Sequence, residues 1–248
     1  MSVIPLHQDA SAPVAPLREQ LARLRAQTES RDTRGLLEFA LKQAFPKRIA
    51  VVSSFAAESV VLLHHVAEID PATPVLFLNT GKLFGETLRY RDRLQDVLGL
   101  TDIRAIGPHP DERNKMDTEG TLWSRDPDSC CNFRKTVPLG RAIVGFAAIV
   151  TGRKRFQTAT RSTMARVELI DNRIRFNPLI DWTLSELTLY IEKKGLPKHP
   201  LVNDGYPSIG CLPCTRRVRA GEGYRAGRWA SFDKDECGMH AGVDGDGI

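Results

Sequence analysis

Five cysteines are the residues of this chain whose types and spacing could do chemistry. Four of them form two tight pairs, Cys130-Cys131 and Cys211-x-x-Cys214, about 80 residues apart. The Cys-x-x-Cys spacing lets two thiolates face one metal ion or one iron–sulfur cluster. Adjacent cysteines are strained as a mutual disulfide, but they can bind different metal atoms of a polynuclear centre. The spacing alone leaves an iron–sulfur cluster, a zinc site and neither of these open.

The fifth cysteine lies in the segment Glu236-Cys237-Gly238-Met239-His240. Its neighbours are charges and glycines rather than the apolar residues that flank a core cysteine, and this favours a reactive thiol. His240 could lower the thiol pKa or donate a proton, and Gly238 would let the backbone approach a ligand closely. The alternative is an incidental exposed cysteine.

Two polar turns follow expected strands. The first is Ser53-Ser54-Phe55-Ala56-Ala57-Glu58-Ser59, and the second is Asn79-Thr80-Gly81. The first turn opens a helix, whose free N–H groups and dipole favour an anion, although it lacks the Gly-Lys pair of a Walker loop. The second turn falls at the carboxyl edge, where open α/β sheets bind ligands. Plain turns are the alternative for both.

Basic residues gather near these segments, and the chain carries a net charge of +5 with a pI of about 9.0. The clusters are Arg134 and Lys135; Arg153, Lys154, Arg155 and Arg161; and Arg216, Arg217, Arg219, Arg225 and Arg228. Nucleic acid is one candidate partner for such a chain. However, these residues form no helical stripe and few aromatic residues lie among them, so a small, multiply anionic ligand explains the clusters better. Solvated surface charge accounts for several of them, including Arg216, Arg217 and Arg219.

Alternating apolar periods indicate the elements that must position these residues. Strands are expected at 49–52, 75–78, 103–106 and within 143–150, and helices from residue 17, at 36–45, 56–69 and 86–98. Two short runs, 167–170 and 174–176, predict a hairpin added to the sheet, and Thr183 with Glu186 forms a capping box for a helix ending near Gly195. This alternation predicts an α/β fold, with an open, mostly parallel twisted sheet and helices on both faces.

The composition, 42% hydrophobic and 26% charged, is typical of a globular protein. No apolar run is long enough to cross a bilayer and no export signal is visible, so we expect a soluble, cytoplasmic protein without a disulfide framework and without membrane partners. Three segments are expected: a flexible tail at 1–15, an α/β nucleotide-binding domain at 16–205, and a Gly/Pro-rich segment at 206–248 that belongs to the same structural domain.

Taken together, the motifs resemble the assimilatory adenylyl-sulfate reductases, the iron–sulfur branch of the phosphoadenylyl-sulfate reductase family. The matching motifs are SSFAAES at 53–59, NTGKLFGET at 79–87, Cys130-Cys131 followed by RK, TGRKRFQ at 151–157 with Arg161, GCLPCT at 210–215, GEGYRAGRW at 221–229 and ECGMH at 236–240. Each motif is moderately specific, whereas the whole set in this order is highly specific. The resemblance implies a sheet of the adenine-nucleotide alpha hydrolase (PP-loop) type.

The resemblance also implies a reaction and the residues that perform it. Adenosine 5'-phosphosulfate would be reduced to sulfite and AMP, with thioredoxin or a similar dithiol as reductant, in assimilatory sulfate reduction toward cysteine. One 4Fe-4S cluster would be held by Cys130, Cys131, Cys211 and Cys214. Cys237 would attack the sulfate sulfur to form an S-sulfocysteine, with His240 and Lys135 in the catalytic set. Arg161, Arg225, Arg228, the serine-rich turn with Glu58, and the Asn79-Thr80-Gly81 turn would bind the substrate.

The sequence departs from the family pattern at three positions. Asn79 replaces the usual Asp, Gly85 replaces the usual Pro, and Met239 replaces the usual Leu. The cysteine pairs favour adenylyl sulfate over 3'-phosphoadenylyl sulfate, although a dual-substrate reductase is one alternative. A PP-loop ATP pyrophosphatase with a zinc Cys-x-x-Cys is a more remote alternative. A cluster-bearing nucleic-acid-binding regulator would be expected to carry a helix-turn-helix or a continuous basic stripe, and this sequence shows neither. A homo-oligomer is compatible with the sequence.

Overall fold

The computed structural model describes residues 14–232, 234 and 236–238, and these contain a six-stranded sheet in the order β3-β2-β1-β4-β6-β5. The strands are β1 (Ile49–Ser53), β2 (Val75–Leu78), β3 (Ile103–Ile106), β4 (Ala148–Thr151), β5 (Val167–Ile170) and β6 (Arg173–Phe176). All pairings are parallel except that of the β5–β6 hairpin at the sheet edge. The expected mostly parallel sheet with an added hairpin is therefore confirmed.

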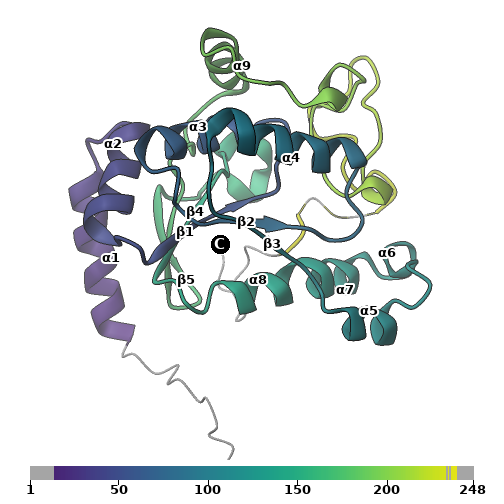
Figure 1. Ribbon diagram of the computed structural model, residues 1–248, viewed down its shortest axis with the longest axis horizontal. Helices are drawn as coiled ribbons and strands as arrows, with labels where there is room; N and C mark the ends of the chain where they lie inside the picture. Colours follow the sequence, from purple (N-terminus) through teal and green to yellow (C-terminus); the bar gives the residue numbers. More distant parts are fainter. Residues whose placement is uncertain (1–13, 233, 235, 239–248) are drawn as a thin grey trace, which may run out of the picture.

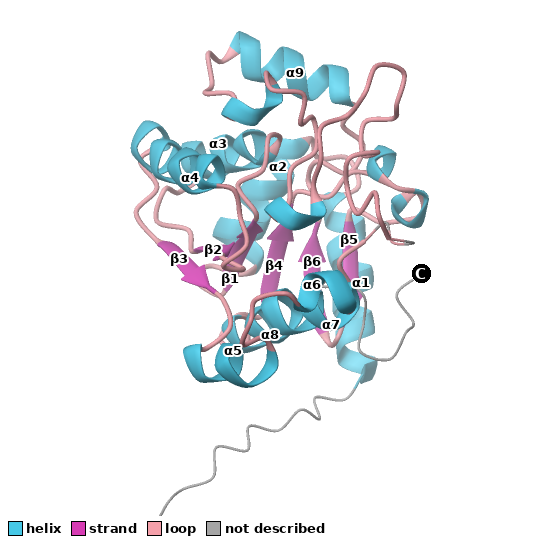
Figure 2. Ribbon diagram, turned by 90° about the vertical axis from the view of Figure 1, so that its right-hand side faces the viewer, coloured by secondary structure: helices cyan, strands magenta, loops and turns pink. Residues whose placement is uncertain are grey.

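Helices cover both faces of this sheet (Figures 1 and 2). The helices α2 (Thr33–Glu38), α3 (Ser59–Ile69) and α4 (Gly85–Leu98) lie over one face, with α9 (Leu184–Lys193) outside α3. The opposite face carries the short helices α5 (Pro110–Met116), α6 (Leu122–Arg125), α7 (Pro127–Cys131) and α8 (Val137–Ala142). Helix α1 (Val14–Thr28) packs beside β5 at the sheet edge. No helix among the described residues is long and apolar enough to cross a membrane.

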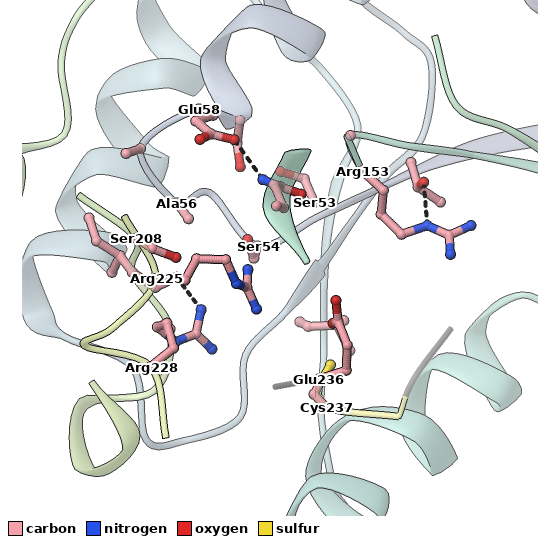
Figure 3. A pocket seen from close by; sticks show the side chains of 18 of the residues that line it. Ser53, Ser54, Ala56, Glu58, Arg153, Ser208, Arg225, Arg228, Glu236 and Cys237 are labelled. Atoms are coloured by element: carbon pink, nitrogen blue, oxygen red, sulfur yellow. Dashed lines mark hydrogen bonds between the residues drawn. The ribbon is translucent and has the colours of Figure 1, made fainter. Parts of the chain in front are cut away.

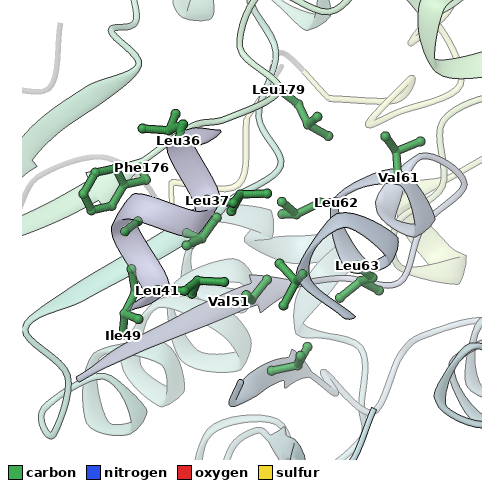
Figure 4. Packing of buried hydrophobic residues seen from close by; sticks show 14 of the residues in the cluster. Leu36, Leu37, Leu41, Ile49, Val51, Val61, Leu62, Leu63, Phe176 and Leu179 are labelled. Atoms are coloured by element: carbon green, nitrogen blue, oxygen red, sulfur yellow. The ribbon is translucent and has the colours of Figure 1, made fainter. Parts of the chain in front are cut away.

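The central strand β1 is buried on both faces because its neighbouring residues enter two different cores. Ile49 and Val51 pack into the larger core with α2 and α3, which Figure 4 shows from close by. Ala50 and Val52 pack on the other face with Leu139 of α8. This continuous apolar character is typical of a parallel strand covered by helices on both sides.

Some expected elements have different bounds. The helix expected at 36–45 consists of α2 followed by a π-helix, Phe39–Ala44. Within the apolar run 143–150, the strand begins only at Ala148. The residues before it follow the end of α8 at Ala142 and connect that helix to the strand. The expected capping box at Thr183 is confirmed, with Thr183 and Glu186 bonded to each other's backbone N–H groups. The expected tail, 1–15, lies outside the described residues except for its last two, which begin α1.

The order of the strands creates a reversal beside β1. The chain runs outward from β1 to β2 and β3, then crosses to β4 on the other side of β1. In open α/β sheets, ligands bind in the crevice outside the carboxyl ends of the strands at such a reversal. The serine-rich turn follows β1 and the basic segment 152–155 follows β4, so both expected motifs lie at this crevice.

Candidate active site

A cavity opens at the carboxyl ends of β1, β2 and β4 (Figure 3). Its walls come from the turn after β1, the loop after β4, the segment 207–211, the segment 224–229, and the tail residues Glu236 and Cys237. Arg225 and Arg228 point into the cavity from one side, and Glu236 and Cys237 lie on the other. The cavity thus combines a sheet edge suited to a nucleotide with several cations and two thiols, those of Cys211 and Cys237.

The turn after β1 is sharp and held from within. Phe55 has a left-handed backbone, with φ of 50°, and its buried ring contacts Phe77 of β2 edge to face at 5.2 Å. The Ser53 hydroxyl accepts a hydrogen bond from the Phe55 N–H at 3.2 Å. A bulky residue in this backbone region is uncommon and costs free energy, so the surrounding packing must hold it. As a result, Ser54 is exposed at the cavity while Phe55 is buried beneath it.

Glu58, just before α3, accepts hydrogen bonds from three side chains in two separate parts of the chain. The Lys154 ammonium and the Tyr224 hydroxyl donate to it at short range, and Gln157 Nε2 donates at 2.8 Å. Burial raises the pKa of Tyr224, and the Glu58 charge raises it further. Since removing one partner of a buried ion pair leaves an uncompensated charge, these contacts firmly tie the β1–α3 turn to the loop after β4 and to the C-terminal segment.

Arg228 is held against Trp229, with its guanidinium carbon 4.3 Å from the indole centroid. Its Nη1 donates to the Ile209 carbonyl at 3.3 Å, while its buried Nε has no hydrogen-bond partner among the described residues. Burial lowers the pKa of Arg228, and the nearby thiols of Cys211 and Cys237 oppose that shift. A cation so held is ready to bind an anion without first rearranging.

Lys135 follows the tandem cysteines and lines both this cavity and a smaller one behind it. Burial would lower its pKa, but the thiols of Cys211, Cys237 and Cys131 outweigh burial and raise it. Lys135 therefore stays a cation between the thiols and the large cavity.

The Cys-x-x-Cys loop is docked on the turn after β2. Cys211 forms an antiparallel bridge with Leu83, and the Leu212 N–H donates to the Lys82 carbonyl at 2.7 Å. The Thr80 hydroxyl lies 3.2 Å from the Cys211 sulfur. On the other side, the Trp229 N–H donates to the Cys214 carbonyl at 3.0 Å. The Gly/Pro-rich segment is thus attached to the sheet domain, although it contributes little core of its own.

All four paired cysteines line the smaller cavity as free thiols. The tandem pair comes from the end of α7, and the other two from the docked loop. Burial raises the pKa of Cys130 to about 11, and the three other thiols raise it as well. Within the described ranges, no group of three or more His, Cys, Asp or Glu side chains is arranged to hold a single metal ion.

The chain is similar to known proteins over most of its length. Residues 48–217 match the phosphoadenosine phosphosulfate reductase domain. The chain is 48% identical over 205 residues to a Mesorhizobium japonicum protein named adenosine 5'-phosphosulfate reductase, covering 83% of this chain and 81% of that one. It belongs to the adenosine 5'-phosphosulfate reductase family. A Rhodococcus opacus protein of the same name is 34% identical, covering 94% of this chain and 98% of the other.

Solved structures agree on the fold. The crystal structure of a Candida auris phosphoadenylyl-sulfate reductase in complex with phosphate superposes with a TM-score of 0.68 at 22% identity. The superposition covers 88% of this chain and 100% of the other. A Candida glabrata FMN adenylyltransferase superposes with a TM-score of 0.53 at 12% identity, covering 88% of this chain and 71% of that one. The family inferred from the motifs and the adenine-nucleotide alpha hydrolase fold are both confirmed.

The four paired cysteines bring thiols from two distant segments to one place. Four thiols from two segments line one cavity, as a polynuclear centre requires. Four cysteine thiolates are the donor set that a 4Fe-4S cluster takes.

Most of the residues expected to bind the substrate do line the large cavity. They are Ser53, Ser54, Glu58, Ser59, Thr80, Arg161, Arg225 and Arg228, together with Lys135 and Cys237. Asn79 and Gly81 are not among the lining residues, because the Asn79 side chain turns back and accepts from the Gly81 N–H at 3.1 Å. His240 lies outside the described residues. Arg216, expected at the surface, is paired there with Glu222.

Sequence reasoning did not assign site roles to Lys154, Gln157, Tyr224 or Glu236, although all four line the cavity. Lys154 and Gln157 belong to the TGRKRFQ motif and Tyr224 to GEGYRAGRW, so their motifs were visible while their roles were not. Glu58, the common partner of Lys154, Gln157 and Tyr224, lies 96 to 166 residues away from them in sequence, and Glu236 lies 75 residues from its partner Arg161. Contacts at that separation carry no local sequence signal.

Proposed function

We propose that this protein reduces adenosine 5'-phosphosulfate to sulfite and AMP, with thioredoxin or a similar dithiol as reductant, in sulfate assimilation toward cysteine. The observation that carries the proposal is a thiol, Cys237, in the same cavity as Arg225, Arg228 and Lys135, at the nucleotide edge of the sheet. The names of the relatives support the same substrate.

In the first step, the Cys237 thiolate attacks the sulfur of the substrate. An S–S bond forms, the bond from sulfur to the phosphate oxygen breaks, and AMP leaves with that electron pair. In the second step, a thiolate of the dithiol attacks the Cys237 sulfur and releases sulfite. The second thiol of the dithiol then frees Cys237, so that the dithiol leaves as a disulfide and supplies both electrons.

The cations lower two electrostatic barriers. A thiolate must approach a sulfuryl group surrounded by negative oxygens, and negative charge develops on the departing phosphate. Arg228, with its unpartnered Nε, and Lys135, between the thiols and the cavity, are suited to offset both charges. We assign Ser53, Ser54, Ser59 and Thr80 to nucleotide contacts, and Glu58 to holding their turn through Lys154 and Tyr224. His240 remains a candidate proton donor.

We further propose that Cys130, Cys131, Cys211 and Cys214 hold one 4Fe-4S cluster. When bound to these four thiolates, the cluster would join the Cys-x-x-Cys loop to α7 and place a fixed charge beside Lys135. No change in its redox state would be required. The four thiols lining one cavity support this assignment.

The proposal is tested by measuring sulfite release from adenosine 5'-phosphosulfate with thioredoxin, on iron-replete protein purified without oxygen. Sulfite and AMP should appear in equal amounts. The 3'-phosphorylated analogue is run in parallel, and comparable kcat/KM values for both would favour a dual-substrate reductase. If neither nucleotide yields sulfite, the proposed function is wrong.

A further inference from the structure

The tail that carries Cys237 is held by two ion pairs on different elements. Lys234 pairs with Asp128 of α7, which also carries the tandem cysteines. Glu236 pairs with Arg161, at the end of the short 3-10 helix Ala159–Arg161. Cys237 is the next residue after Glu236, so its position depends on these contacts.

The two pairs differ in how much they can restrain the tail. The Asp128 side chain is 82% exposed, and such a surface pair contributes little. The Arg161 and Glu236 side chains are only 13% and 26% exposed. Glu236 accepts from Arg161 Nη2 at 2.7 Å and from the Thr158 hydroxyl at 3.0 Å. The Glu236 contact is therefore the stronger restraint.

Arg161 is itself fixed before it meets the tail. Its Nη1 donates to Gln157 Oε1, and Gln157 donates through Nε2 to the buried Glu58. The guanidinium is thus joined, through one amide, to the network that shapes the turn after β1. Glu236 meets an arginine that is already oriented, so less conformational freedom is lost when the two pair.

The Glu236 carboxylate is unexpected in a cavity that is proposed to bind an anion. Glu236 lines the same cavity as Arg225 and Arg228, and a free carboxylate there would repel a phosphosulfate group. Pairing with Arg161 neutralises it. We propose that Glu236 is a positioning residue, which docks the tail on Arg161 and Thr158 and so sets the Cys237 thiol at the cavity. Arg161 then serves as the anchor of the tail rather than as a substrate cation. This inference rests on the proposed function.

Positioning and substrate binding predict different kinetic effects. Loss of the anchor moves the thiol without removing a cation that contacts the nucleotide, so the rate of S-sulfocysteine formation falls while affinity is kept. Misplacement by about 1 Å can cost about a hundredfold in rate. Glu236→Ala and Arg161→Ala should each produce a loss of that order in a single turnover. The double variant should be no slower than either single variant, because both remove the same contact.

Affinity is measured in a Cys237→Ser background, in which nothing turns over. Adenosine 5'-phosphosulfate should bind with a Kd within about twofold of the parent in Glu236→Ala and in the double variant. Arg161→Ala alone leaves the Glu236 carboxylate in the cavity without this cation, so it should weaken binding. Glu222→Ala is the matched control, since Glu222 also pairs with an arginine, Arg216, in the C-terminal segment but does not line the cavity. It should leave rate and affinity unchanged.

A third readout needs no substrate. In unliganded holoenzyme, iodoacetamide should alkylate Cys237 several-fold faster in both Glu236→Ala and Arg161→Ala, as mass spectrometry of the tail peptide would show. Loss of the Arg161 cation without release of the tail would instead slow alkylation, because a nearby cation favours the thiolate.

The outcomes separate the two proposals. The inference is overturned if the double variant binds the substrate tenfold or more weakly than Glu236→Ala, or if both single variants behave like Glu222→Ala in an active enzyme. Faster alkylation in both variants of an enzyme that releases no sulfite would support the tail anchor and reject the proposed function.

Discussion

At Cys237, charges of both signs surround a single thiol. Lys135 and Arg228 lie close enough to interact with its charge, and the neighbouring Glu236 carboxylate is neutralised by Arg161. These two cations can offset negative charge around the reacting sulfur. None of these partners is near Cys237 in sequence apart from Glu236.

Replacing the Cys237 sulfur should therefore stop the reaction without disturbing the site. Cys237→Ser should abolish sulfite release to below one part in about 10⁴, because a serine hydroxyl without an adjacent base is a far weaker nucleophile. Affinity for AMP should stay within about twofold. Activity is followed by sulfite production and affinity by calorimetry, and a variant that still turns over would remove Cys237 from the role of nucleophile.

Gly210 is required by the close approach of Arg228. A Cβ at Gly210 would overlap the guanidinium and lie 2.9 Å from its Nε. Gly210→Ala should displace Arg228 from Trp229 and weaken AMP binding by about tenfold to a hundredfold, the loss of one charge-assisted hydrogen bond. Gly223→Ala is the matched control, because a Cβ there meets nothing within 4 Å. Equal AMP affinities in the two variants would contradict the placement of Arg228 in the site.

At the scale of elements, α3 and α9 meet through a buried histidine. His65 stacks on Tyr190 at 4.8 Å, and neither ring nitrogen has a hydrogen-bond partner among the described residues. Burial lowers the pKa of His65 to about 4, with His64 and Lys194 lowering it further and Glu68 opposing. The neutral ring is the form that fits between the two helices.

This packing should make the stability of the protein depend on pH. Because the folded pKa lies below the unfolded value near 6.5, the contribution of His65 is complete above pH 6.5 and is lost as the pH falls toward 4. Between pH 7.5 and pH 5 the loss is about 2 kcal/mol. His65→Leu should reduce the difference between the urea midpoints at these two pH values, measured on holoenzyme.

Wild-type protein is the reference for that comparison. His199, whose pKa burial also lowers to about 4, is present in both proteins, so its contribution cancels. An unchanged difference between the two midpoints would show that His65 does not titrate on unfolding.

At the scale of the whole molecule, the segment 206–229 depends on a few attachments to the sheet domain. Among the described residues these include the Leu83–Cys211 bridge, the bond from Leu212 to Lys82, the Tyr224–Glu58 contact and the packing of Tyr206 and Ile209 on Phe84. The proposed cluster would add a covalent link from this segment to α7. Such a link restrains a chain that buries little apolar area of its own.

Removing the proposed cluster should therefore loosen this segment. Protein purified without oxygen should be brown and contain about four irons per chain. After iron chelation, limited proteolysis should cut within residues 206–229 at least several-fold faster than in the holoenzyme. Metal content is measured by mass spectrometry, with cleavage in the exposed 170–173 turn as the internal control. Colourless protein with one tightly bound zinc would defeat the cluster assignment.

Local sequence determined most of the fold and the identity of the reacting groups. The strands and the α9 cap follow from apolar period and capping chemistry, which act within a few residues. Helices α5 to α8 were missed because they are short and lack an apolar period. They are recognisable only in the folded chain, where they lie on one face of the sheet. The cysteine pairs and the thiol in ECGMH were visible as residue types at diagnostic spacings.

Only the tertiary structure decided what those residues contact. Glu58 meets Lys154 and Tyr224, and Glu236 meets Arg161, across 75 to 166 residues of chain. These partners are brought together by the strand reversal beside β1 and by the docking of the C-terminal segment, which depend on the whole sheet. A charge in a sequence does not reveal its partner, because ion pairing depends on distance in space. The roles of Glu58 as a support for the turn and of Arg161 as an anchor for the tail could therefore be inferred only from the folded chain.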